Sequence, residues 1–234
     1  MATKTSSNQK IKRLLIILVC VLAAAAIGFL IFIFGLSKGY TFNIQNSGSI
    51  QITGFWGDKV NAEIPSSILG RSVTSIIDLN EPALVRLELP ESIGRIYPQG
   101  WSSSTKLAEI HVDRFNPAFS SEDGVLFSDS CYLDNDYTER QMVQLVMYPP
   151  YKEGTSYTVP NSVLQLSTFA FHNCKNLREV HIPSSVISIE GNLFSGSSVT
   201  DVYYHGTQSQ WERIDFSYGA SLEDSGINVH FVGN

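Results

Sequence analysis

The feature that most limits how this chain can fold is a repeat of about 23 residues. Four segments align on a proline: AEIPSSI from Ala62, LELPESI from Leu87, YTVPNSV from Tyr157 and VHIPSSV from Val180. Counted at the residue before each proline, the successive intervals are 25, 70 and 23 residues. The sequence therefore predicts a chain built from short coils of near-constant length.

Aromatic residues and strand signatures recur with the prolines in a fixed order, although the first coil lacks the aromatic residue. Trp101, Phe171 and Phe194 each follow an aliphatic residue at an interval of five. The strand signatures are LVRLEL from Leu84, LAEIHV from Leu107, LREVHI from Leu177 and VTDVYY from Val199. Period-two alternation points the fourth and sixth residues of each signature inward and the residue between them outward.

Stacked coils account for this order, because a single coil cannot bury its own apolar face and the ends of a stack need caps. Proline turns the chain after each strand and supplies no amide donor. A β-sandwich would also contain periodic apolar residues, but it has no reason to repeat proline, aromatic residue and strand signature in one order. We therefore expect a β-rich solenoid of about four coils.

An uncharged apolar stretch over residues 14–36 predicts a transmembrane helix. As a helix it would be roughly 34 Å long, enough for a hydrocarbon core of about 30 Å. Lys4, Lys10, Lys12 and Arg13 precede it, so the positive-inside rule places a basic tail, residues 1–13, in the cytoplasm and the remainder outside. A cleaved signal peptide is the alternative, but its apolar region is usually only about 7–15 residues long. We expect a single-pass protein of the cell membrane.

The exported part divides into three regions. Residues 37–63 are expected to form a linker and an N-terminal β cap, residues 64–204 the solenoid, and residues 205–234 a C-terminal cap. In the C-terminal cap, Thr207 and Gln210 suit a helix capping box, Trp211 and Ile214 share one helical face, and Ile227, Val229 and Phe231 alternate inward on a closing strand.

An insertion over residues 113–156 interrupts the repeat. GVLF from Gly124 and QLVMYPP from Gln144 predict a β-hairpin with a long polar tip at about residues 128–141. Carboxylates in this tip could bind calcium or a protein, but no glycine that would turn a calcium loop lies among them. A plain solvated loop is the simpler interpretation.

Charge and motifs exclude several functions. The chain carries −6, and residues 1–37 carry four basic and no acidic residues, so the exported part carries −10 and would repel nucleic acid. The sequence holds no nucleophile elbow, zinc-protease motif or phosphate-binding glycine loop. Cys131 and Cys174 are expected to be small buried residues, although a disulfide between them is possible. We expect no enzyme, cofactor or metal site.

The outward strand positions are the candidate ligand-binding residues, because stacked coils present an extended surface there. They form two columns, although a merely solvated strand face would show the same pattern. A metal pair of His111 and His181 would need the insertion to loop out of the stack. The first column is Glu88, His111, His181 and Tyr203, and the second is Arg86, Glu109, Glu179 and Asp201.

These segments together resemble the BspA-like leucine-rich repeat family of bacterial and some protist surface proteins. The matching segments include IPSSVISIEGNLF from Ile182, NPAFSSEDGVLF from Asn116 and VYYHGTQSQWERI from Val202. The resemblance implies a leucine-rich-repeat solenoid with parallel strands on one face, attached to the cell surface, and supplies no catalytic residues. It favours a binding module for a protein or glycan ligand. The alternative is a structural or regulatory ectodomain that associates with another envelope protein.

Overall fold

A computed structural model describes residues 18–19, 21–22, 39–55, 59–79, 81–97, 101, 106–133, 139–217, 222 and 226–233, without the side chains of 130–133 and 139–141. The predicted cytoplasmic tail and nearly all of the predicted transmembrane helix lie outside these residues. The four that belong to it, Leu18, Val19, Val21 and Leu22, are helical and exposed. Within the described ranges, no helix has the length and apolar character needed to cross a membrane.

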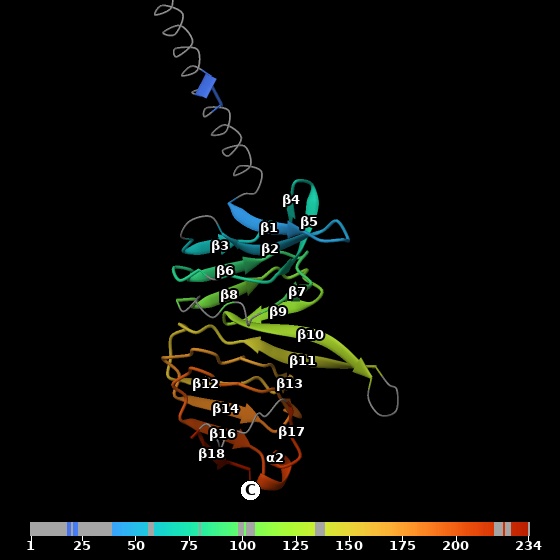
Figure 1. The fold of residues 1–234 in the computed structure, drawn as a ribbon. Helices are drawn as coiled ribbons and strands as arrows, with labels where there is room; N and C mark the ends of the chain where they lie inside the picture. Colours follow the sequence, from blue (N-terminus) through green and yellow to red (C-terminus); the bar gives the residue numbers. More distant parts are fainter. Residues whose placement is uncertain are drawn as a thin grey trace, which may run out of the picture.

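Parallel strands, one from each coil, form the front face of a solenoid (Figure 1). Three of them pair in one sheet and four in a second sheet farther along the stack. The seven strands are β3 (Asn61–Glu63), β6 (Arg86–Leu89), β8 (Glu109–Val112), β12 (Ser156–Thr158), β14 (Glu179–Pro183), β16 (Asp201–His205) and β18 (Asn228–Phe231). Inward residues such as Leu87, Ile110 and Val180 are fully buried.

The solenoid therefore has about seven coils, and the expectation of about four was too low. The four strand signatures correspond to β6, β8, β14 and β16. The other three front strands place Ala62, Tyr157 and Val229 at the same inward register position as Leu87 and Val180. Their coils lack the leading leucine, so the strand signature did not count them, although the proline alignment included Ala62 and Tyr157 and Val229 was expected on a closing strand.

A second column of short strands lines the back of the coils, and the sequence analysis did not predict it. Elements close to the pattern Val-x-x-Ile follow the proline turns, as in Val186-Ile187-Ser188-Ile189, and these elements form parallel strands. The back strands are β2 (Ile50–Phe55), β5 (Arg71–Ile76), β7 (Arg95–Ile96), β13 (Val163–Leu166), β15 (Ser188–Ile189) and β17 (Asp215–Phe216), with β1 (Tyr40–Ile44) and β4 (Ser67–Ile68) added antiparallel.

The insertion forms the predicted hairpin, from β10 (Val125–Leu133) and β11 (Glu139–Met147), with β9 (Phe119–Glu122) along the outer edge of β10. Its arms are longer than expected, because residues 128–133 and 139–141, predicted as a polar tip, are paired strands. The hairpin projects from the side of the stack (Figure 1). β11 pairs in parallel with β13, so the hairpin belongs to the back sheet.

The hairpin also separates two hydrophobic cores. Leu126 and Val146 pack into the N-terminal core, whereas Val125, Phe127 and Leu145 pack into the C-terminal core. This alternation follows from the period-two geometry of a strand with one core on each side. The repeated aromatic residues are buried as predicted: Trp101, Phe171 and Phe194 are 3%, 0% and 8% exposed.

The C-terminal region combines a short helix with the last described front strand. In α2 (Gln208–Trp211), Thr207 and Gln210 form the predicted capping box, and Trp211 and Ile214 are both buried. β18 pairs in parallel with β16 and so continues the stack. Ile227 is buried and Val229 half-buried. Phe231 lies opposite the buried Tyr204, as the predicted alternation requires, and its ring is 6.5 Å from that of Tyr204, although it is 40% exposed.

Candidate ligand-binding face

Strand register brings the predicted site residues together in two groups of four. In the first group, Arg86 lies opposite Glu109 and Glu88 opposite His111. In the second group, Glu179 lies opposite Asp201 and His181 opposite Tyr203. The eight residues do not form one continuous surface, because β8 and β12 belong to different sheets with the insertion between them. His111 and His181 are therefore on different sheets, and the metal pair considered for them does not form.

The first group is an ion-pair network. The Arg86 guanidinium donates from Nε to Glu88 Oε1 at 2.9 Å and from Nη1 to Glu109 Oε1 at 3.5 Å. His111 Nε2 lies 2.8 Å from Glu109 Oε2, and this hydrogen bond is the main reason why the pKa of Glu109 lies below its usual value. These side chains are about 40% exposed, so each pair stabilises the fold by no more than about 1 kcal/mol.

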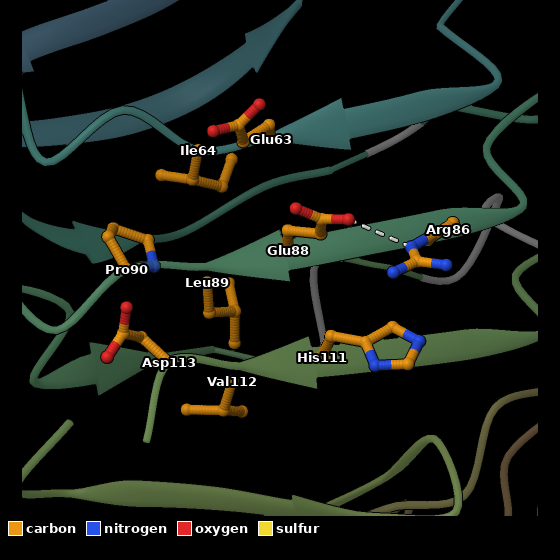
Figure 2. A pocket seen from close by; sticks show the side chains of 9 residues that line it. All are labelled: Glu63, Ile64, Arg86, Glu88, Leu89, Pro90, His111, Val112 and Asp113. Atoms are coloured by element: carbon orange, nitrogen blue, oxygen red, sulfur yellow. Dashed lines mark hydrogen bonds and ion pairs between the residues drawn. The ribbon is translucent and has the colours of Figure 1, made fainter. Parts of the chain in front are cut away.

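A groove of about 280 Å³ adjoins this network where the three strands turn (Figure 2). Ile64, Leu89 and Val112, one from each coil, supply its apolar lining together with Pro90. The carboxylates of Glu63, Glu88 and Asp113 give it negative charge, and the Arg86 guanidinium and His111 also line it. A neighbouring hollow of about 580 Å³ shares Glu63 and Asp113 and adds Glu91. The two hollows together form an acidic groove with an apolar base.

The acidic groove has an excess of negative charge. Glu63 and Glu88 lie directly opposite each other on β3 and β6, and like charges in this position destabilise a sheet. Arg86 offsets Glu88, but within the described residues no ion pair involves Glu63 or Asp113. The Asp113 carboxylate accepts only the amide N–H of Phe115 at 2.9 Å, among the hydrogen bonds of the described residues. A cationic group would therefore be attracted here.

The second group is dominated by rings. His181 stacks on Tyr203 with centroids 4.9 Å apart, and Tyr203 stacks on His230 at 4.7 Å. His230 Nε2 lies 2.7 Å from Asp201 Oδ1, and this hydrogen bond is the main reason why the pKa of Asp201 is lowered. His205, two residues after Tyr203, reaches His181.

Sequence reasoning missed four residues of this face: Glu63, Asp113, His205 and His230. The repeat could have supplied His230, because Ile227-Asn228-Val229-His230 places His230 in the outward position that Tyr203 has in VTDVYY. His205 follows Tyr203 by two residues and so shares its face. Glu63 has the same outward position on β3 as Glu88 on β6, but its coil carries Lys59 in place of the leading leucine of the signature. Asp113 directly follows β8, where the strand signature ends.

Parallel front strands with inward aliphatic residues and outward polar columns define a leucine-rich-repeat solenoid protein. Residues 151–231 match the family model described as "BspA type Leucine rich repeat region (6 copies)". The resemblance found in the sequence is thereby confirmed for residues 151–231, which carry leucine-rich repeats of the BspA type.

The first of three similar solved structures agrees with this fold. A leucine-rich repeat protein from Eubacterium ventriosum is 13% identical, with a TM-score of 0.50 over 85% of this chain and 72% of that chain. A leucine-rich repeat protein of T. pallidum is 20% identical over 71% and 69% of the two chains, with a TM-score of 0.43. A leucine-rich cell surface protein from Faecalibacterium prausnitzii is 13% identical over 76% and 96%, with a TM-score of 0.38. No curated protein matches the sequence significantly.

Proposed function

We propose that this protein is a membrane-anchored, extracytoplasmic binding module that takes a protein or glycan ligand on its strand face and performs no catalysis. Anchoring rests on the uncharged apolar residues 14–36 and the basic residues before them. Binding rests on the solenoid, since stacked coils offer an extended surface to which each coil adds one outward strand.

The acidic groove is the observation that carries the proposal. Its lining combines apolar contact with carboxylates from three coils, which suits a ligand that presents a lysine or arginine side chain. A bound cation would also relieve the repulsion between Glu63 and Glu88. The apolar stem of such a side chain would lie on Ile64 and Val112, and its charged end would reach the carboxylates.

The proposal is tested by measuring binding to the purified full chain. The ligands are short synthetic peptides that each carry one lysine or arginine, and neutral glycans. We expect basic peptides to bind and the double variant Glu63→Gln, Asp113→Asn to lose that binding. The matched control is Glu153→Gln, Asp215→Asn, which removes the same charge at two exposed positions off the front face.

Binding that is equal in the groove variant and the parent would overturn the acidic groove as the site. Joint substitution of His181 and Tyr203 by alanine separates the two groups of the strand face. If only this variant loses binding, the ligand lies on β14 and β16 instead. If neither variant loses binding of a ligand that the parent captures, the strand face is not the binding surface.

A further inference from the structure

Two histidines on the second sheet direct ring nitrogens at each other. His181 Nδ1 and His205 Nε2 lie 3.1 Å apart. Their ring centroids are 5.3 Å apart and their planes are inclined by 41°. His181 lies on β14 and His205 at the end of β16, so two neighbouring coils supply the pair. The arrangement is independent of the acidic groove, which lies on the other sheet.

The nitrogen separation fits chelation of one metal ion. Zinc–imidazole bonds are about 2.0–2.1 Å long, so two ligands at the tetrahedral angle have nitrogens about 3.3 Å apart, and two at a right angle about 2.9 Å. The observed separation lies between these values. Imidazole is a preferred ligand of Zn²⁺, Cu²⁺ and Ni²⁺, and a pair of imidazoles on one ion suits tetrahedral and square-planar geometry alike.

The surroundings hold the pair in place and favour a cation. His181 is half-buried and stacks on Tyr203 with an interplanar angle of only 14°, so little ring freedom would be lost on binding. The carboxylates of Glu179 and Asp201 lie two residues before His181 and Tyr203 on the same face. His205 is exposed, so an ion held by this pair is open to water on its outer side.

We propose that His181 on β14 and His205 at the end of β16 bind one divalent transition-metal ion. The described residues contain no group of three or more metal-ligating side chains, so water or a donor from a bound molecule fills the remaining positions. Without metal, one ring donates an N–H to the other. Binding needs both facing nitrogens unprotonated, so the donor ring takes its other neutral tautomer.

Titration of the untagged, chelator-treated full chain with Cu²⁺ and Zn²⁺ tests this proposal. We expect one Cu²⁺ per chain, with nitrogen hyperfine coupling from two imidazoles in the electron paramagnetic resonance spectrum. His181→Gln and His205→Gln should each weaken Zn²⁺ binding in calorimetry by at least about tenfold. His172→Gln is the control, because His172 is a histidine outside the front face.

His205 is exposed, so His205→Gln should keep the fold, and a far-UV circular dichroism spectrum identical to that of the parent checks this. Affinity of His205→Gln within about twofold of the parent would overturn the proposal. A copper spectrum without imidazole coupling would also overturn the proposal, and the contact between His181 and His205 would then be a hydrogen bond only. Peptide binding at the acidic groove is unaffected by these substitutions under either outcome.

Discussion

The Phe171 side chain is the sharpest test of how the coils are stacked. It is fully buried. Its ring centroid lies 5.3 Å from that of Phe194 on the next coil and 5.7 Å from that of Tyr148, which directly follows β11. The Tyr157 ring lies 6.2 Å away. Phe171 therefore joins aromatic residues of successive coils inside the C-terminal core.

Replacing Phe171 by alanine should lower the free energy of unfolding by about 4 kcal/mol. Truncation of a buried phenylalanine costs about 3–5 kcal/mol, because transfer energy is lost and a cavity remains. Collapse of the cavity is limited here, since Phe194 and Tyr148 are themselves held by their own coils. For a chain of this size about 1 kcal/mol corresponds to roughly 2–4 °C, so the melting temperature should fall by about 8–16 °C.

Thermal unfolding of the full chain, followed by circular dichroism, measures this change. The control is Phe115→Ala, because the Phe115 side chain is 65% exposed and contacts the Arg114 guanidinium at 4.5 Å. That substitution should cost less than about 1 kcal/mol. If Phe171→Ala melts no lower than Phe115→Ala, the aromatic residues do not carry the stacking of the coils and the reasoning is refuted.

Two further predictions concern local geometry and pH. Gly124 has φ +73°, and a Cβ on it would lie 3.0 Å from Glu109 Cβ, whereas Gly70 has φ +71° with open space around it. In urea unfolding, Gly70→Ala should lower the free energy of unfolding by only the roughly 1–2 kcal/mol that a left-handed backbone costs an alanine. Gly124→Ala should lower it by more, because the added Cβ also meets Glu109. Equal losses in the two variants would show that β8 does not constrain Gly124. His230→Gln should raise the pKa of Asp201, because the His230 hydrogen bond is the largest cause of its lowering. Since the folded pKa is lowered, the contribution of this contact is present above the unfolded pKa of Asp201 and disappears as the pH falls through the folded value. Carboxyl NMR titration of Asp201 measures the change, and an unaltered Asp201 curve in His230→Gln would contradict the assignment.

Residues that recur in every strong repeat could be predicted from the sequence. Proline, the aromatic residue and the leading leucine each have one structural role in a coil. Their spacing therefore predicted the solenoid, the inward positions of Leu87 and Val180, and the burial of Phe171. The Thr207 capping box could be read for the same reason, since both partners lie within one turn of chain.

Coils with weaker signatures could not be counted in this way. The coils of Ala62, Tyr157 and Val229 carry Lys59, Gly154 and Gly226 where the strand signature has its leading aliphatic residue, and none of these three residues is buried. The back strands escaped notice because a two-residue strand such as Arg95–Ile96 is too short to show alternation.

The candidate face shows a similar limit. The outward columns followed from period-two alternation, which is a local property. Their division into two groups depends on where the hairpin arms join the sheets, and this is decided by contacts between residues far apart in sequence, such as Leu145 with Leu166. The acidic groove was missed because Glu63 belongs to a coil without the leading leucine of the strand signature, although it has the same outward position as Glu88. Asp113 was missed because it directly follows β8, where the alternating strand ends.

The two cores on either side of the hairpin have a consequence for how the protein comes apart. Leu126 and Phe127 are neighbours in sequence, yet each is buried in a different interior. Unfolding that begins at one end of the stack can therefore stop at β10 and β11, because the other hydrophobic core stays packed against the opposite side of these strands. Amide exchange should accordingly divide into two cooperative regions that meet at this partition, each with its own opening free energy.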